Sequence, residues 1–245
     1  MVISRVGQDA AGDELRRLLA DAGADTSHLQ SDPDLPTGRV IVRALGDTVA
    51  RYLETRTAFD NLQWDYDLED IAQQADAVEY SMLTRRSGQT RSEENRFLAA
   101  CAGAIKVFDL TYGGGGDLDR RLAQSGLEYA DIVVVNRAVL SAVMPGTNGQ
   151  PIEEAVASLQ RQVDASAVIG VEHEDSRRRW TLHRDRERFD ATTPGDGAMA
   201  DVAPLVAILH GVLRGKPFDE TMQLASRVAG HVAERPDDPL PEEWL

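Results

Sequence analysis

Two glycine-rich stretches of the sequence are candidates for a phosphate-binding or catalytic site. Residues 113–116 are four consecutive glycines whose backbone amides could cradle a phosphate, but no Lys-Ser/Thr pair follows, so a flexible loop is expected there. The second stretch, residues 192–201, places glycine and aspartate just ahead of an apolar run that ends near Leu213. Taken alone, it fits two interpretations equally well: a capped turn in which an aspartate begins a helix, or a catalytic turn that binds phosphate.

Other reactive side chains do not combine into a catalytic or metal site. Cys101, the only cysteine, lies in an alanine-rich run and is expected to be a small buried residue. His173 and His183 lack the spacing of metal ligands. The basic run at 177–179 is expected to be a solvated strand edge with acidic partners. No metal site is predicted.

The charge balance argues against two classes of partner. The 245 residues include 26 Lys and Arg against 41 Asp and Glu, which gives a net charge of −15. Such a surface repels nucleic-acid phosphates and anionic lipid headgroups, so neither nucleic acid nor a membrane is an expected partner. The sequence has a single cysteine and shows no apolar stretch typical of a secretory signal peptide or a membrane-spanning helix, so a cytoplasmic protein is expected.

Strand-like and helix-like patterns alternate along the chain, which is typical of a sheet with crossover helices. Apolar runs typical of buried parallel strands lie at residues 77–83, 105–110, 132–135 and 167–171. Amphipathic helices are expected at residues 93–102, 118–125 and 152–163. The predicted fold is a three-layer α/β/α domain with a mainly parallel sheet.

Residues 38–55 interrupt this alternation. Two alternating segments, 38–45 and 48–55, flank Gly46-Asp47, which is a suitable two-residue hairpin turn. The pattern predicts a β-hairpin that projects from the domain as a partial lid or an oligomer contact.

Several ordered motifs resemble those of the PfkB (ribokinase-like) carbohydrate kinases. The sequence RVGQDAAG at 5–12 is similar to the family's RVGxDxxG, AGADTSH at 22–28 to AGVDTSH, and PTGRV at 36–40 to PTGxV. Further on, SMLTRRS at 81–87 and HGVLRG at 210–215 resemble GxLAQRS and HGLLRG of the fructokinase-like branch. The resemblance covers essentially residues 1–245 and implies one kinase domain with the ribokinase-like, Rossmann-like fold.

The resemblance also implies an activity, the transfer of the γ-phosphoryl group of ATP, with Mg²⁺, to a sugar hydroxyl. The family draws its catalytic base and its anion hole from a Gly-Asp turn at a helix N-terminus. Gly195-Asp196 matches this pair best, so Asp196 is the candidate base and Gly195 and Gly197 are candidate phosphate-binding residues. Asp201 is the alternative base, because Asp196 lies farther from the HGVLRG motif than the family spacing.

Other matched motifs imply contacts with the nucleotide and the sugar. Asn136 stands at the family's Asn-x-x-Glu motif and Gly170 near its nucleotide loop, so both are expected to contact the cofactor. Asp109, in the segment that matches FDxNxR, and Arg39, beside the lid, are expected on the sugar side.

The chain departs from the family at several positions. Thr111 and Gly113 replace the Asn and Arg of FDxNxR, and Val139 replaces the Glu that orders magnesium. The chain also begins after the strand and the Gly-Gly-Asn helix with which family members open. Because phosphoryl transfer depends on positioning and charge stabilisation, turnover is predicted to be several orders of magnitude slower than in an intact relative.

Two interpretations therefore stay open. One is a fructokinase-like sugar kinase, and the other is a weak or inactive relative that binds nucleotide or sugar or acts as a structural partner. A homo-oligomer is expected in either case, because an exposed strand edge or an uncovered lid face favours pairing with another chain.

Overall fold

The computed structural model describes most of the chain and divides it into two compact units. The described residues are 1–45, 48–111, 120–144, 146–147, 149–174, 176–184, 187–195, 202–235, 238, 240–241 and 244, with the backbone alone at 42–45, 48–52 and 174. Unit 1 comprises Met1–Ala75 and Met82–Ala104, and unit 2 comprises Asp76–Ser81 and Ile105–Leu245. Each unit is described by itself.

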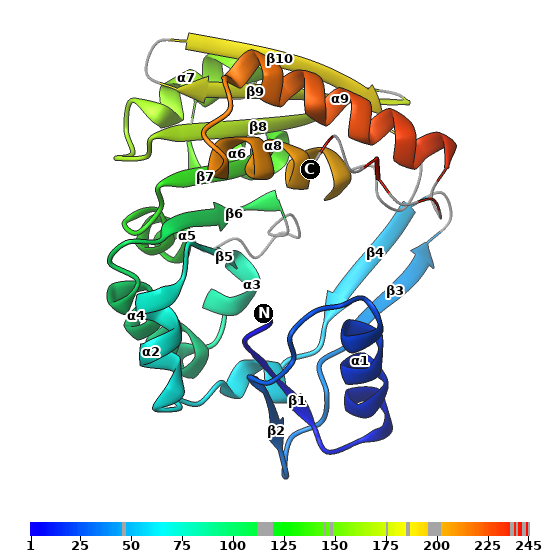
Figure 1. Cartoon of the computed structure of the whole chain (residues 1–245), viewed down its shortest axis with the longest axis vertical. Helices are drawn as coiled ribbons and strands as arrows, with labels where there is room; N and C mark the ends of the chain where they lie inside the picture. Colours follow the sequence, from blue (N-terminus) through cyan, green and yellow to red (C-terminus); the bar gives the residue numbers. More distant parts are fainter. Residues whose placement is uncertain are drawn as a thin grey trace. The chain divides into compact units, whose positions relative to one another are not determined.

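Unit 2 is built on a six-stranded sheet with the strand order β10-β9-β8-β7-β6-β5 (Figure 1). The strands are β5 (Ala77–Ser81), β6 (Ile105–Asp109), β7 (Ile132–Asn136), β8 (Ala167–Glu174), β9 (Arg177–Arg184) and β10 (Glu187–Pro194). The first four are parallel, which confirms the predicted parallel strands, and β9 and β10 continue the sheet in antiparallel fashion.

Helices cover both faces of this sheet. They are α5 (Arg120–Leu127), α6 (Arg137–Val143), α7 (Ile152–Gln160), α8 (Val202–Leu213) and α9 (Phe218–Glu234). On one face Ile169 and Trp180 of the sheet share a buried core with Ile208 of α8 and Met222 of α9. On the other face Gly170 packs against α7. The predicted three-layer α/β/α arrangement is therefore confirmed.

Unit 1 carries two small sheets (Figure 1). Its elements are β1 (Ser4–Gly7), α1 (Ala10–Asp21), β2 (Leu29–Asp32), β3 (Val40–Leu45), β4 (Thr48–Leu53), the 3₁₀ helix η1 (Ala58–Asn61), α2 (Asp67–Gln74), α3 (Met82–Arg85) and α4 (Gly88–Ala100). β1 and β2 are parallel, and β3 and β4 form the predicted antiparallel hairpin, whose turn residues 46–47 lie outside the described residues.

Several predicted boundaries differ from the structure. The strand expected at 77–83 ends at Ser81, the helix expected at 152–163 ends at Gln160, and the helix expected at 118–125 ends at Leu127. The helix expected at 93–102 begins earlier, at Gly88, because the Ser87 side chain caps it by accepting from Thr90 N. The residues between Ser87 and Glu93 are mostly polar, so an apolar-periodicity argument could not find this first turn.

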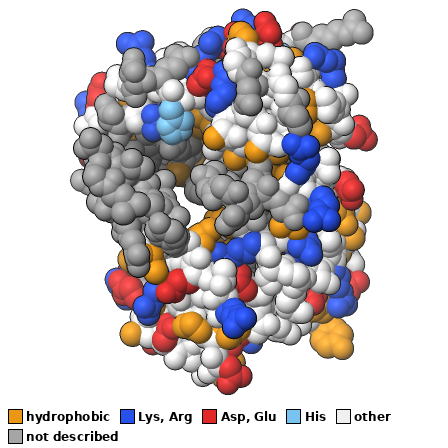
Figure 2. Space-filling view, turned by 180° about the vertical axis from the view of Figure 1, so that it is seen from behind, with side chains coloured by type: hydrophobic (Ala, Val, Ile, Leu, Met, Phe, Trp, Pro, Cys, Tyr) orange, Lys and Arg blue, Asp and Glu red, His pale blue; other side chains and the backbone are white. Residues whose placement is uncertain are grey.

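The face of the molecule drawn in Figure 2 carries charged groups of both signs. In the space-filling view, acidic and basic side chains are interspersed with small apolar groups (Figure 2). No helix among the described residues is long and apolar enough to cross a membrane.

Candidate active-site edge of the unit 2 sheet

Several predicted site residues lie at one edge of the unit 2 sheet. The parallel strands β5 to β8 end at this edge, and β10 ends there too, because Pro194 pairs with Arg177 and Arg177 pairs with Glu174. Open α/β sheets bind their ligands at the carboxyl ends of the strands. Asp109 ends β6, Asn136 ends β7, and Gly195 follows β10 directly, so the sheet brings all three to the same edge.

The two carboxylate oxygens of Asp109 differ in their hydrogen bonding. Its side chain is 1 % exposed. Oδ1 accepts hydrogen bonds from the backbone N and from Oγ1 of Thr111, both at 2.6 Å. Oδ2 is buried and has no hydrogen-bond partner in the described part of the chain. Burial raises the pKa of Asp109, and the two bonds from Thr111 oppose that rise.

Asn136 connects the end of β7 to the segment that follows β6. As the N-cap of α6, its Oδ1 accepts from Val139 N at 2.9 Å. Its Nδ2 donates to Thr111 O, also at 2.9 Å. Asn136 thus fixes the turn that positions Asp109. Val139, which stands at the magnesium-ordering position of the motif, is buried at 1 % exposure.

Most of the turn that contains the candidate base lies outside the described residues. Asp196, Gly197 and Asp201 are among the residues that the structure does not describe. Gly195 is described, and its N–H donates to Ser176 O at 2.7 Å. A Cβ on Gly195 would lie 2.7 Å from Arg177 N, so the turn requires glycine at this point. An anion hole here would have to draw on other amides.

Gly170 does not lie at this edge. It sits within β8, in register with Val135 and Thr181. A Cβ at Gly170 would lie 2.5 Å from Val156 Cγ2 of α7, closer than side-chain atoms approach. The missing side chain lets α7 pack directly on the sheet.

Arg39 belongs to unit 1, where it lies near a tightly bonded aspartate. Asp9 caps α1 by accepting from Gly12 N at 2.8 Å, and it also accepts from Thr37 N at 2.9 Å and Thr37 Oγ1 at 2.7 Å. These bonds, the Thr37 side chain first, lower the pKa of Asp9 to about 2, and the charge of Arg39 adds to the effect. The RVGQDAAG and PTGRV motifs are therefore joined by their side chains.

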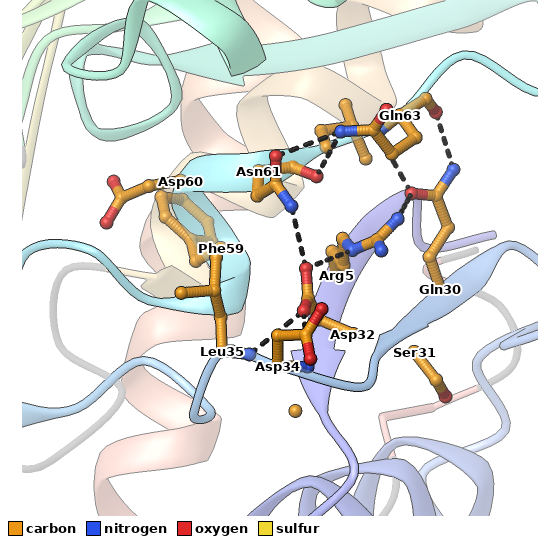
Figure 3. A network of polar contacts seen from close by, with 12 residues as sticks. Arg5, Gln30, Ser31, Asp32, Asp34, Leu35, Phe59, Asp60, Asn61 and Gln63 are labelled. Carbon is orange, nitrogen blue, oxygen red and sulfur yellow. Dashed lines mark hydrogen bonds and ion pairs between the residues drawn. The ribbon is translucent and has the colours of Figure 1, made fainter.

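A second network in unit 1 was not predicted from the sequence. Asp32 Oδ2 accepts from Arg5 Nε and Asn61 Nδ2, both at 2.8 Å, and Oδ1 accepts from the backbone N of Asp34 and Leu35 (Figure 3). Burial disfavours the charged carboxylate, but these bonds outweigh it and lower the pKa of Asp32 to about 2. The network joins β1, β2 and η1.

Glu79 is a further acidic residue that the sequence interpretation missed. It lies in β5 and is exposed to solvent, and its pKa is raised first by partial desolvation and then by the negative charge of Asp109. A sequence signal existed, because Glu79 places a charge within an otherwise apolar strand pattern.

The described residues do not form a metal centre. No group of three or more His, Cys, Asp or Glu among them could hold a metal ion. Because Val139 is apolar and buried, the α6 end of the edge supplies no ligand for Mg²⁺. The described residues therefore fit a Mg²⁺ ion poorly.

The fold and the edge define an α/β protein of the Rossmann-like class, whose members bind ligands at the carboxyl ends of the strands. The model of the pfkB family carbohydrate kinases matches residues 1–170, and the chain belongs to this family.

Three solved structures illustrate the similarity. A PfkB protein from Polaromonas sp. JS666 is 19% identical with a TM-score of 0.72, covering 95% of this chain and 79% of that one. A 2-dehydro-3-deoxygluconokinase from Thermotoga maritima is 14% identical with a TM-score of 0.73, covering 93% and 76%. A Vibrio cholerae O395 fructokinase with bound fructose, ADP and calcium ion is 18% identical with a TM-score of 0.71, covering 93% and 75%. The search of curated proteins gave no match.

Proposed function

We propose that this chain is an ATP-dependent sugar kinase of the fructokinase-like branch, which transfers the γ-phosphoryl group of ATP to a sugar hydroxyl. The observation that carries the proposal is the gathering of Asp109, Asn136 and Gly195 at one sheet edge, with Asp196 next along the chain. The similar Vibrio cholerae fructokinase was solved with fructose and ADP, and this adds support for both ligand classes.

In this proposal Asp196 takes the proton from the attacking sugar hydroxyl as the new O–P bond forms and ADP leaves. Asp201 is the alternative base. Gly195 and Gly197 lie in the phosphate-binding turn, and Asn136 lies on the nucleotide side. The family resemblance assigns Gly170 to the nucleotide as well, but its position within β8 against α7 favours a packing role. Asp109 and Arg39 act on the sugar. The described residues offer Mg²⁺ no set of ligands.

Residues 1–245 act as one kinase domain in this proposal, with the hairpin at 38–55 as a lid. The protein is cytoplasmic and pairs with a second copy.

A second candidate function is binding without efficient turnover. Two observations favour it: Val139 is buried at a position where a carboxylate would order the metal, and Thr111 is committed to Asp109 rather than to a phosphate. Each lost charge-stabilising contact removes roughly 3 kcal/mol of transition-state stabilisation. Together these losses make turnover slow even if both ligands bind.

The test is ADP release with a panel of sugars, comparing the natural chain with Asp196→Asn and Asp201→Asn. Asp196→Asn is expected to abolish sugar-dependent ADP release, while Asp201→Asn retains it. If only Asp201→Asn abolishes release, the base assignment is wrong and Asp201 takes its place. If no sugar raises ADP release above background, the second candidate function replaces the first.

A further inference from the structure

Glu79 and Asp109 lie on the same face of neighbouring parallel strands. In the register of β5 and β6, Ser81 pairs with Asp109 and Glu79 pairs with Val107. Side chains two residues apart on a strand share a face, so Glu79, Ser81 and Asp109 lie on one face near the carboxyl ends of both strands. The pKa of Glu79 is raised by partial desolvation and also by the charge of Asp109, which agrees with this placement.

Asp109 also leaves a buried acceptor without a donor. Thr111 holds Oδ1 with two bonds, whereas Oδ2 has no partner in the described part of the chain although the residue is 1 % exposed. A buried acceptor that lacks a donor costs free energy. Because this oxygen lies at the edge where ligands bind, a ligand that donates a hydrogen bond would recover that cost.

The charge at this point decides which ligand group fits. Neither carboxyl group forms an ion pair with any described residue. A ligand carboxylate or phosphate placed here would add a third negative charge to two that already repel each other. A sugar hydroxyl carries no charge and donates a hydrogen bond, so it meets both requirements.

We propose that Glu79 and Asp109 form a hydroxyl-binding site that selects neutral sugars over sugar acids, an inference that rests on the proposed sugar-kinase function. Asp109 Oδ2 accepts from a sugar hydroxyl, and Glu79 excludes a substrate carboxylate. The distinction matters within this fold, because similar structures include a fructokinase and a 2-dehydro-3-deoxygluconokinase.

The experiment is calorimetric binding of fructose and of gluconate to the whole chain without nucleotide, so that it is independent of catalysis. The natural chain is expected to bind fructose about tenfold more tightly than gluconate. Glu79→Gln should bind gluconate several-fold more tightly while retaining fructose. Asp109→Asn should weaken the affinity for fructose about tenfold. The new amide would present either its NH₂ donor or a neutral oxygen, which accepts more weakly than a carboxylate, to the sugar hydroxyl.

Glu128→Gln is the matched control, because Glu128 is exposed in the same unit between α5 and β7, toward the amino ends of the strands. It should leave both affinities unchanged. Equal affinity of the natural chain for the two ligands, no binding of fructose, or identical behaviour of Glu79→Gln and Glu128→Gln would each overturn the proposal. The expected selectivity without sugar-dependent ADP release would support this site while removing the kinase function.

Discussion

Asp32 is a heavily bonded carboxylate of unit 1. It accepts from Arg5, Asn61 and two backbone amides, and it is 2 % exposed. Arg5 itself is 14 % exposed, so loss of Asp32 would leave a poorly solvated guanidinium without its partner. Buried charges that lose their partner are costly. The RVG segment thus serves folding through Arg5, before any contact with substrate is considered.

We expect Asp32→Asn to destabilise the protein by roughly 2 to 3 kcal/mol at neutral pH. The folded-state pKa of Asp32, about 2, lies below its ordinary value of 3.8. Its contribution is therefore fully present above pH 3.8 and is lost as the pH falls toward 2. Urea unfolding of both proteins should show a difference that shrinks across this window.

Asp34→Asn is the control, since Asp34 is exposed and only its backbone N binds Asp32. It should change the free energy of unfolding little. A stability difference between the natural chain and Asp32→Asn that stays constant from pH 6 to below 3 would contradict this assignment.

At the scale of elements, β8 and α7 pack so closely that one glycine decides their spacing. Gly170→Ala would place a Cβ 2.5 Å from Val156 Cγ2, and valine has little rotational freedom in a helix. We expect a loss of about 1 to 3 kcal/mol in the free energy of unfolding.

The double variant Gly170→Ala with Val156→Ala removes the clash and should recover part of that stability. Nucleotide binding measured on the same three proteins then separates two roles. Recovery of both properties would assign Gly170 to packing, whereas recovered stability without recovered binding would support the predicted contact with the cofactor. If Gly170→Ala alone is as stable as the natural chain, the packing argument fails.

Much at this scale followed from the sequence, for physical reasons. The four parallel strands are mostly apolar runs, which are typical of a sheet covered on both faces. The hairpin carried its own turn signal. The extension of the sheet by β9 and β10 could not be predicted from the sequence. The many basic residues of β9 indicate an exposed strand, although its Trp180 and Leu182 are buried. The neighbours of Asp109 were hidden too, since register between strands is a tertiary property.

At the scale of the whole molecule, apolar side chains on the hairpin predict self-association. Val40 and Leu53 pair directly across β3 and β4 and are 54% and 41% exposed. Exposed apolar groups of this kind favour association with another copy. We expect light scattering at high micromolar concentration to show a species larger than the monomer, which the double variant Val40→Asp, Leu53→Asp abolishes.

Tyr66→Asp is the control for that prediction, because Tyr66 is 88% exposed in the same unit but away from the hairpin. It should leave the association intact. A monomeric natural chain at this concentration would contradict the prediction.

We expect that this member of the PfkB carbohydrate kinase family still transfers phosphate to a sugar. The most direct measurement is ³¹P NMR of the chain incubated with ATP, Mg²⁺ and fructose, followed for many hours. We predict a sugar-phosphate signal that grows slowly, several orders of magnitude below the rate of an intact fructokinase, and that is absent with Asp196→Asn. Hydrolysis of ATP to inorganic phosphate without any sugar phosphate, or an equal product signal from Asp196→Asn, would contradict it.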